Sequence, residues 1–404
     1  MRRRVAVTGI GVVCALGADR ESFWAAVAGA RSAIGPLDEL AGDGVKIRTG
    51  ARIRGFDPDA HFAPRQRDLL DPFAQYAVVA ARQAVADAGL EWSDTLRAAG
   101  AVITGSSMGG QAAMEEGYRR LYAEGASRVH PLSIPRIMAN SAASAIAVEL
   151  GLTGPAFTLS TACSSANHAL GLGLWLLRQG AADLVLAGGS EAPFTYGNLK
   201  GWEALRVVSP TTCRPFSRDR DGMVLGEGAA ILVLEPWEAA RARGARIWAE
   251  LAGFGMSADA HHVTQPTVEG PVRAMAGALQ DAGLEPADVG YVNAHGTATP
   301  VNDPVEVRAI RRLFGAHADR LAVSSTKSLH GHALGAAGAL EAAATSLALH
   351  HQLLPPTANF TEADPECDLD VVPNASRPGD FTAALSNSFA FGGLNAVLVF
   401  RRAD

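Results

Sequence analysis

The chain has 404 residues, enough for one large or two medium domains that each contain an apolar core. Its 35 Lys and Arg against 41 Asp and Glu give a net charge of −6, which excludes a general electrostatic attraction to nucleic acid or to an anionic membrane surface. The 43 glycines and 48% hydrophobic residues are typical of an α/β protein with tight turns, and they argue against a disordered or fibrous chain.

The cysteines and the N-terminal stretch indicate the compartment. Cys14, Cys163, Cys213 and Cys367 show neither CxxC nor paired spacing, which predicts a reducing, cytoplasmic environment. The apolar stretch after Arg4 resembles a secretory signal, but glycine and threonine interrupt it and charged residues stand where a cleavage site should lie. We therefore expect a buried first strand there. No run of about 18 apolar residues follows, so no membrane-spanning helix is expected.

Strands and helices alternate along the first half of the chain. The clearest helical pattern covers 72–88 and ends at Gly89, a residue type that suits the left-handed end of a helix. Residues 31–63 are expected to be irregular because proline and glycine interrupt them, and 111–150 to be mainly helical. The other expected elements are a helix over 21–28 and strands over 5–13, 101–104, 184–186 and 229–234.

A second set of elements begins at about residue 247 and repeats parts of the first. The sequence AVADAGLE at 84–91 returns as ALQDAGLE at 278–285, and HALG at 168–171 returns at 332–335, where each copy is expected to open a helix of small residues. The matches keep their order but differ in spacing, as in a duplicated α/β unit with an insertion in one copy. Paired helices of such a fold lie side by side near its pseudo-symmetry axis. This relationship predicts that Cys163 and His332 lie near one site.

The stretch 158–177, TLSTACSSANHALGLGLWLL, contains the candidate nucleophile. Cys163 stands where a strand ends and a helix begins at about Ser164, among small residues that let the backbone turn sharply. The helix N-terminus directs free N–H groups and the positive end of its dipole at the sulfur, so we expect a lowered thiol pKa. A small buried apolar residue is the alternative for any single cysteine, and we assign that role to the other three.

Candidate partners for this cysteine lie in the second half of the chain. His295 directly follows a predicted strand, in the small-residue turn NAHGTATP. Lys327 and His332 lie in KSLHGH before a helix rich in alanine and glycine, and the glycine turn at 387–395 can offer backbone N–H groups. Cys163, His295 and His332 are zinc ligand types, but they lack the short paired spacing of zinc sites, so we predict no metal.

Four motifs in this order resemble those of the β-ketoacyl-acyl carrier protein synthases, and most closely the elongating type II kind. They are TACSS at 161–165, NAHGTxTP at 293–300, KSxxGH at 327–332 and NSFxFGG at 387–393. The resemblance covers essentially the whole chain. It implies an α/β, thiolase-like fold with two similar βαβαβ-type halves in a five-layered αβαβα arrangement, and it implies a dimer. The halves would be 1–243, with the nucleophile and cap insertions, and 244–404, with the histidine pair.

The resemblance also implies acyltransferase chemistry. An acyl group moves from a carrier-protein thioester to Cys163, malonyl-carrier protein loses carbon dioxide, and the resulting enolate attacks the acyl group to extend the chain by two carbons. His295 and His332 would donate N–H groups to the developing oxyanion. The expected cofactor is none, because phosphopantetheine arrives on the carrier protein.

Supporting roles follow from the same resemblance. Lys327 would orient the histidines and tune their charge state, with Glu341 as its counter-charge; an amine nucleophile is the less favoured role for this lysine. The N–H groups of Cys163 and Phe391 would form the oxyanion hole during acylation. The expected substrate-binding residues are the gating Phe391, Met108, Thr297 and Thr299, and the expected carrier-binding residues are Arg65, Arg67, Arg128, Arg136 and Arg206. For Met108 and Phe391 a core role, and for each arginine a solvated surface role, is the alternative.

Several residues depart from the family pattern. Ala298 stands where glycine or serine is usual, and His330 stands where threonine is common. Ala390 replaces a usual glycine and Leu394 a usual threonine, and Ala390 suggests a stiffer gate. These departures favour a specialised synthase for polyketide, polyene or modified acyl chains, acting as a homodimer or beside an inactive, chain-length-factor-like partner. A thiolase would need a second cysteine near the C-terminus, a non-catalytic partner subunit would lack Cys163, and nothing indicates the water activation of a cysteine hydrolase.

Overall fold

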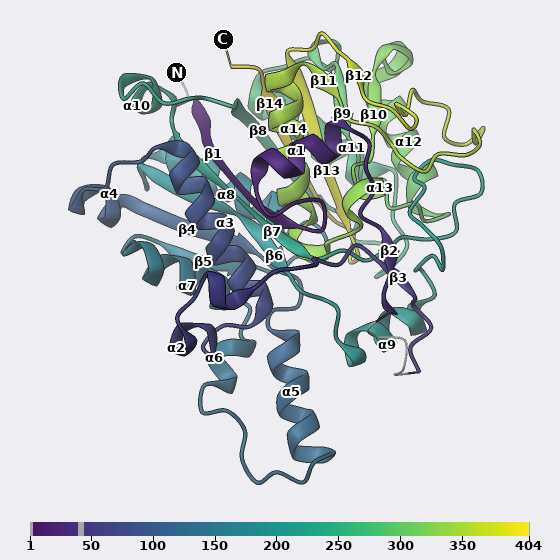
Figure 1. Ribbon diagram of the computed structural model, residues 1–404. Coiled ribbons are helices and arrows are strands. Elements are labelled where there is room, and N and C mark those ends of the chain that lie inside the picture. The colour runs from purple at the N-terminus through teal and green to yellow at the C-terminus, as the bar shows by residue number, and fades with distance from the viewer. Residues whose placement is uncertain (1–2, 39–43, 404) are drawn as a thin grey trace.

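Two five-stranded units form the central β-structure, and a computed structural model describes residues 3–38 and 44–403 of the chain (Figure 1). The two units join edge to edge between β1 and β8, where only the pairs Ala6–Glu250 and Val7–Ala249 are in register. The strand order is β10-β9-β13-β14-β8-β1-β7-β6-β4-β5. The first unit contains β1 (Val5–Cys14), β4 (Gly100–Gly105), β5 (Ala156–Leu159), β6 (Leu184–Glu191) and β7 (Gly228–Pro236). The second contains β8 (Ala249–Ala258), β9 (Tyr291–Asn293), β10 (Ala322–Ser324), β13 (Ala383–Ala390) and β14 (Leu394–Arg401).

Both units have the same topology. In the first, β5, β4 and β6 are parallel, and β7 and β1 follow as antiparallel neighbours. In the second, β10, β9 and β13 are parallel, and β14 and β8 follow in the same way. Each strand of one unit therefore has a counterpart in the other. The predicted duplication of an α/β unit is confirmed.

Helices cover both faces of each unit and complete five layers. The middle layer consists of α8 (Ser165–Gln179) and α14 (Ala337–His351), which contact each other and strands of both units. One outer layer contains α3 (Pro72–Ala88) and α7 (Ser141–Leu150), and the other contains α11 (Glu269–Ala282) and α12 (Asn302–Phe314). The side-by-side arrangement of the two middle helices agrees with the prediction from the HALG repeat.

A Gly-x-Gly pair in the first strand of each unit explains how closely the outer helices pack. A Cβ at Gly9 or Gly11 of β1 would collide with backbone carbonyls of α3, and one at Gly253 or Gly255 of β8 would collide with those of α11. The residue between each pair donates its backbone N–H to an aspartate of the facing helix, at 2.9 Å from Ile10 to Asp87 and 3.0 Å from Phe254 to Asp281. These aspartates are the ones in the DAGLE repeat.

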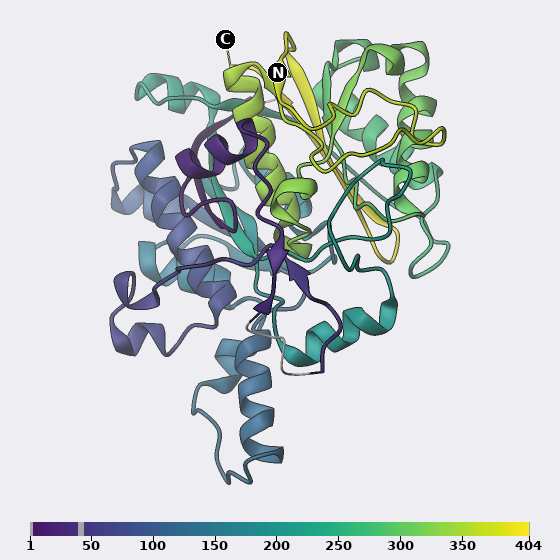
Figure 2. The same ribbon diagram turned by 45° about the vertical axis from the view of Figure 1, so that its right-hand side comes forward.

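Shorter elements surround the layers. Helix α5 (Gln111–Tyr122) extends away from the body of the molecule (Figures 1 and 2). The remaining helices are α1 (Arg20–Ala28), α2 (Pro64–Arg67), α4 (Asp94–Ala99), α6 (Ser133–Ile137), α9 (Tyr196–Leu205), α10 (Trp237–Ala242) and α13 (Lys327–His330). The short strands β2 (Gly35–Pro36) and β3 (Thr49–Gly50) pair with each other, as do β11 (Leu353–Leu354) and β12 (Arg377–Pro378). Short 3-10 turns cover Pro58–Ala60, Pro286–Asp288, Gly315–Arg320 and Leu334–Ala336.

One predicted element starts later than expected. The helix expected to open at His332 begins at Ala337, after a single 3-10 turn over Leu334–Ala336. The φ of Leu334 is +49°, in the left-handed region, so a continuous α-helix cannot pass through it. His332 consequently lies in an irregular segment ahead of the helix, where its ring is free to face the cysteine.

Candidate active site

Cys163 lies in a tight turn between β5 and α8. Ala162 before it has a φ of +51°, a left-handed conformation that is uncommon for any residue with a Cβ. Hydroxyls of the following two serines cap the turn, from Ser164 to the carbonyl of Thr161 at 2.8 Å and from Ser165 to that of Ala162 at 2.6 Å. The small residues of TACSS therefore have the local role predicted for them.

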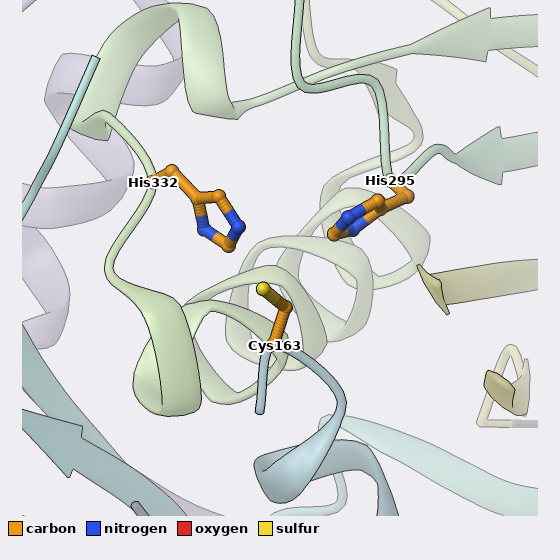
Figure 3. Close-up of side chains that lie close together, drawn as sticks. All are labelled: Cys163, His295 and His332. Carbon is orange, nitrogen blue, oxygen red and sulfur yellow. The ribbon is translucent and has the colours of Figure 1, made fainter. Parts of the chain in front are cut away.

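Two histidines from the second half of the chain face this cysteine (Figure 3). One ligand-type atom each of Cys163, His295 and His332 lies within 4.8 Å of the others, and all three side chains are buried. The imidazole centroids are 5.5 Å apart and the rings are nearly perpendicular, at 85°. The structure thus brings together the three residues that the sequence pattern singled out.

Backbone contacts fix His332 and define its tautomer. Its N–H donates to the carbonyl of Val224 at 2.7 Å, and its carbonyl accepts from Gly226 at 2.9 Å. Its Nδ1 accepts the backbone N–H of Leu334 at 3.2 Å, which places the ring proton on Nε2. Burial, Lys327 and His330 hold the pKa of His332 well below 6.5. The ring is therefore neutral and presents Nε2–H as a donor.

His295 is held through its backbone. Its N–H and that of Gly296 donate to the two oxygens of Glu306, at 2.8 and 2.7 Å. Within the described ranges its Nδ1 has no hydrogen-bond partner, so a bound substrate can set its tautomer. Burial, Lys327 and His332 lower its pKa well below 6.5. Two neutral imidazoles thus share one buried space.

The thiol pKa differs from the prediction. Burial raises the pKa of Cys163 to about 11, and the opposing effects of the Lys327 charge and of the Phe391 backbone N–H are smaller. The expected lowering by the N-terminus of α8 does not determine the direction, because a buried thiolate loses its hydration. The thiol of Cys163 is therefore neutral in the free protein.

Lys327 and Glu341 form a buried ion pair. The lysine ammonium donates to Oε1 of the glutamate, and neither side chain is exposed. Burial raises the pKa of Glu341, and the lysine opposes that rise. The predicted counter-charge is therefore in place, and the lysine acts on both histidines through its field.

Two further buried carboxylates organise the site, and the sequence patterns did not single them out. Glu306 holds the His295 turn and also accepts Nδ2 of Asn387 at 3.2 Å; burial raises its pKa to about 7. Glu191, at the end of β6, accepts the backbone N–H groups of Ser107 and Gly335 at 2.7 and 3.0 Å. Each had a signal in the sequence: Glu191 is an acidic residue at the end of a buried strand, and Glu306 is an acidic residue on the buried side of helix α12.

A cavity of about 430 Å³ opens onto the three residues. Thr297 and Thr299 line it, with their hydroxyls 3.0 Å apart, as do Phe391 and Arg206. Trp202, which the sequence patterns did not single out, also lines it and lies nearly parallel to Phe391, with centroids 6.3 Å apart and an angle of 25°. Met108 does not line this cavity. It packs beside an apolar cluster that includes Met223, a cavity residue, so its assignment to an acyl pocket stays a prediction.

The candidate carrier-binding arginines differ in their surroundings. Arg67 pairs with Asp59 at 2.6 Å and with Asp68 at 3.1 Å, and Arg136 is partly buried beside Glu116 at 3.3 Å. Arg65 and Arg128 are exposed and away from the cavity lining. Arg206 is the member of the set that reaches the cavity.

The three central side chains also satisfy the first requirement of a metal site, because their ligand atoms are close and of zinc-binding types. The buried Lys327 ammonium, whose charge lowers the pKa of both histidines, opposes a dication at the same place. The catalytic interpretation therefore remains the better one.

Among the residues that the structure describes, none of the helices is both long and apolar enough to cross a bilayer.

Comparisons with known proteins agree with the geometry. The models for the N-terminal and C-terminal domains of β-ketoacyl synthase match residues 2–240 and 248–361. Nodulation protein E of Rhizobium sp. (strain N33) is 48% identical over 402 residues, 100% of both chains. The 3-oxoacyl-[acyl-carrier-protein] synthase 2 of Staphylococcus aureus (strain N315) is 41% identical over 407 residues, 99% of this chain and 98% of that one.

A solved structure is also similar. The ishigamide ketosynthase/chain length factor superposes with a TM-score of 0.95 at 38% identity and covers 100% of each chain. The sequence motifs, the duplicated five-layered thiolase-like fold and the grouping of one cysteine with two histidines fit this family. The chain belongs to the β-ketoacyl synthase family and is an acyltransferase with that family's fold.

Proposed function

We propose that the protein is a 3-oxoacyl-[acyl-carrier-protein] synthase that elongates an acyl chain by two carbons, with Cys163 as nucleophile. The observation that carries this proposal is the convergence on one sulfur of two neutral imidazoles and the backbone N–H of Phe391. The two histidines and Phe391 come from the other half of the duplicated fold.

In the first step, the sulfur of Cys163 attacks the carbonyl of an acyl thioester on the carrier protein. The backbone N–H groups of Cys163 and Phe391 donate to the oxyanion that forms. The proton that leaves Cys163 is taken up by the departing phosphopantetheine sulfur, so the exchange conserves charge. A thiol pKa of about 11 suits an exchange in which the proton leaves during attack, because a permanent thiolate is not required.

In the second step, malonyl-carrier protein loses carbon dioxide. The electrons of the broken carbon–carbon bond form an enolate, whose negative charge lies on the thioester oxygen. Nε2–H of His332 and an N–H of His295 donate to that oxygen. The enolate carbon attacks the acyl-cysteine carbonyl, the 3-ketoacyl product forms, and the Cys163 sulfur leaves as a thiolate that takes up one proton from solvent. A neutral pair suits this step, because imidazolium charge would stabilise the malonyl carboxylate and oppose its loss.

We propose that phosphopantetheine enters on the carrier protein and that the protein holds no cofactor of its own. The cavity is lined by Thr297 and Thr299, whose hydroxyls can donate to the pantetheine amides. The exposed guanidinium of Arg206 at the same cavity suits an acidic carrier and its phosphate. Arg65, Arg67, Arg128 and Arg136 stay as weaker candidates.

A dimer, either of two copies or with a related subunit, is supported by one face of the molecule. Strand β5 is the edge of the sheet, so its outer side lacks a partner strand within the described chain. Helix α7, which contacts β5, carries the exposed Val148, and the adjoining α6 and α5 carry exposed Ile134, Tyr118 and Tyr122. The chain itself has the complete catalytic set, so in a heterodimer we assign it the catalytic role.

The test is the intact mass of the protein after incubation with an acyl-carrier-protein thioester. We expect an acyl adduct on the wild type and on Cys213→Ala, a buried-cysteine control, but not on Cys163→Ala. Malonyl-carrier protein should then discharge the adduct as a 3-ketoacyl product. Failure to form an adduct at every acyl length, also with a candidate partner subunit present, would refute the catalytic role, and discharge by water alone would indicate a hydrolase.

A further inference from the structure

His330 is a buried histidine that the proposed chemistry does not use. It is the last residue of α13, two positions before His332, and its exposed fraction is 0%. A polar ring so deeply buried is stable only when both nitrogens have partners. Both do, and the partners belong to the segments that carry the active-site residues.

The direction of each hydrogen bond follows from the chemistry of the partners. Nδ1 of His330 lies 2.8 Å from the carbonyl oxygen of Gly331, which can only accept, so Nδ1 carries the proton. Nε2 lies 3.1 Å from Oγ1 of Thr326 and accepts its proton, because an Nε2 without a proton has no other partner here and the alternative acceptor of that hydroxyl, Oδ1 of Asn293, is farther away at 3.4 Å. Burial and the charge of Lys327 lower the pKa of His330 to about 3, which keeps the ring neutral as this arrangement requires.

The hydrogen-bond chain continues across the sheet. Nδ2 of Asn293, at the end of β9, donates to Oγ1 of Thr326 at 3.3 Å. The chain therefore runs in one direction, from Asn293 through Thr326 and His330 to the carbonyl of Gly331. Gly331 has a φ of +68°, which favours glycine, and the imidazole holds the carbonyl of its peptide while the carbonyl of Val224 holds the N–H of the same peptide.

Each anchor of this chain lies within two residues of an active-site group. Asn293 precedes His295, Thr326 precedes Lys327, and Gly331 precedes His332. Thus one buried hydrogen-bond chain connects the backbones that carry both imidazoles and the ammonium. A shift of about 1 Å in such groups is enough to lower a rate by about 100-fold.

We propose that His330 is a positioning residue for condensation, which locks the Gly331–His332 peptide to the segments carrying Lys327 and His295 so that both imidazole N–H groups reach the malonyl oxygen together. This inference rests on the proposed function. It assigns His330 no contact with substrate. It predicts a defect in decarboxylative condensation rather than in acyl transfer to Cys163.

Four variants distinguish the loss of either hydrogen bond of the His330 ring from a general loss of stability. His330→Asn keeps an amide N–H near the position of Nδ1, whereas His330→Gln places an amide near Nε2. Thr326→Val removes the hydroxyl that links Asn293 to His330. His317→Gln is the matched control, because His317 also bonds a backbone carbonyl, that of Val289 at 2.8 Å, but lies outside the active site.

Two rates are measured for each variant: acylation of Cys163 by intact mass and release of carbon dioxide from malonyl-carrier protein on the acyl-enzyme. We expect His330→Gln and Thr326→Val to lower kcat for condensation about tenfold or more, with KM for malonyl-carrier protein and the acylation rate changed about twofold or less. His330→Asn should retain more activity than either, and His317→Gln should match the wild type. Folded His330 and Thr326 variants with wild-type kcat and a lowered melting temperature would overturn the proposal.

Histidine-selective ¹⁵N NMR gives a readout that does not depend on turnover. The Nε2–H signal of His332 should shift in the His330 and Thr326 variants and stay in place in His317→Gln. A wild type that fails to condense any acyl chain refutes the proposed function, whereas unshifted His332 signals refute the positioning role. If the His330 variants do not fold, Thr326→Val alone decides the matter.

Discussion

Lys327 and Glu341 are paired with neither side chain exposed, and the lysine charge adds to burial in lowering the pKa of both His295 and His332. The pair therefore places a positive charge beside the two imidazoles while the carboxylate compensates the cost of burying it. This relationship connects the stability of the core to the charge state of the site.

Replacing one member of the pair should destabilise the protein more than replacing both. Lys327→Met leaves Glu341 as an uncompensated buried acid and should lower the free energy of unfolding by about 3–5 kcal/mol. The double variant Lys327→Met/Glu341→Leu should recover most of this loss in urea unfolding. Equal stability of the single and double variants would contradict an ion pair that matters for folding.

The same double variant should change the pH dependence of condensation. Burial, the largest cause of the low pKa of His295 and His332, remains in the variant, but loss of the ammonium raises both pKa values, so a larger fraction of the rings is charged in mild acid. The ratio of variant to wild-type kcat should therefore be lower at about pH 6 than at about pH 8. A ratio independent of pH would show that the lysine does not tune the histidines.

The stacking of Trp202 on Phe391 should restrict the acyl chains that the cavity accepts. Trp202→Ala removes the ring that holds Phe391 and should raise the acylation rate of Cys163 about tenfold for the longest acyl groups tested, with little change for short ones. The measurement is a chain-length scan by intact mass. Trp92→Ala is the control, because Trp92 stacks with Arg97 and does not line the cavity. An unchanged chain-length profile in Trp202→Ala would exclude it as a specificity residue.

The charge at the cavity should contribute to carrier binding through one arginine more than the others. Arg206 lines the cavity, and none of the carboxylates in the described chain pairs with it, whereas two aspartates already neutralise Arg67. Arg206→Ala should raise KM for acyl-carrier protein about tenfold without lowering kcat, and Arg67→Ala should change it about twofold or less. Equal effects of the two substitutions would place the carrier elsewhere.

Local sequence patterns predicted most of the main elements and the proximity of Cys163, His295 and His332. Small residues in TACSS and in NAHGTATP predicted turns at strand ends, and the DAGLE and HALG repeats predicted the paired layers that bring Cys163 beside His332. These features depend on neighbours in the sequence. They are therefore visible in one chain alone.

Features that depend on distant segments were not predictable in this way. The thiol pKa of Cys163 rises because the fold buries it, and burial depends on every layer above it. Glu306 and Glu191 gained their roles only when their partners from other segments came within hydrogen-bond distance. The late start of α14 follows from the left-handed φ of Leu334, a backbone conformation that is rare for leucine and that the sequence does not indicate.

Close packing of the outer helices should make the paired glycines equally intolerant of substitution. Gly11→Ala and Gly255→Ala each drive a methyl group into a helix backbone and should each lower the free energy of unfolding by about 2 kcal/mol or more. Gly201→Ala in α9 meets no atom within 4 Å and should instead stabilise the protein by about 0.5–1 kcal/mol. Chemical unfolding of the three variants gives the comparison. A tolerated Gly255→Ala would break the proposed equivalence of the two units.

His330 should make the stability of the wild type fall in mild acid. Its folded-state pKa is about 3, against about 6.5 in the unfolded chain. Below about pH 6.5 the unfolded chain therefore binds a proton at this residue that the folded protein does not bind. The stability associated with the neutral ring is complete above about pH 6.5 and declines as the pH falls. At about pH 5 this residue alone should cost about 2 kcal/mol relative to pH 7.5.

The variant His330→Asn cannot titrate in this range, so its free energy of unfolding should decline less between about pH 7.5 and 5, by about 2 kcal/mol. Other buried groups titrate in both proteins, and their effects cancel in the difference. Urea unfolding at each pH measures that difference. Parallel curves for wild type and His330→Asn would mean that the buried ring is protonated in the folded protein. They would then also contradict the direction of the hydrogen bond from Thr326 to His330.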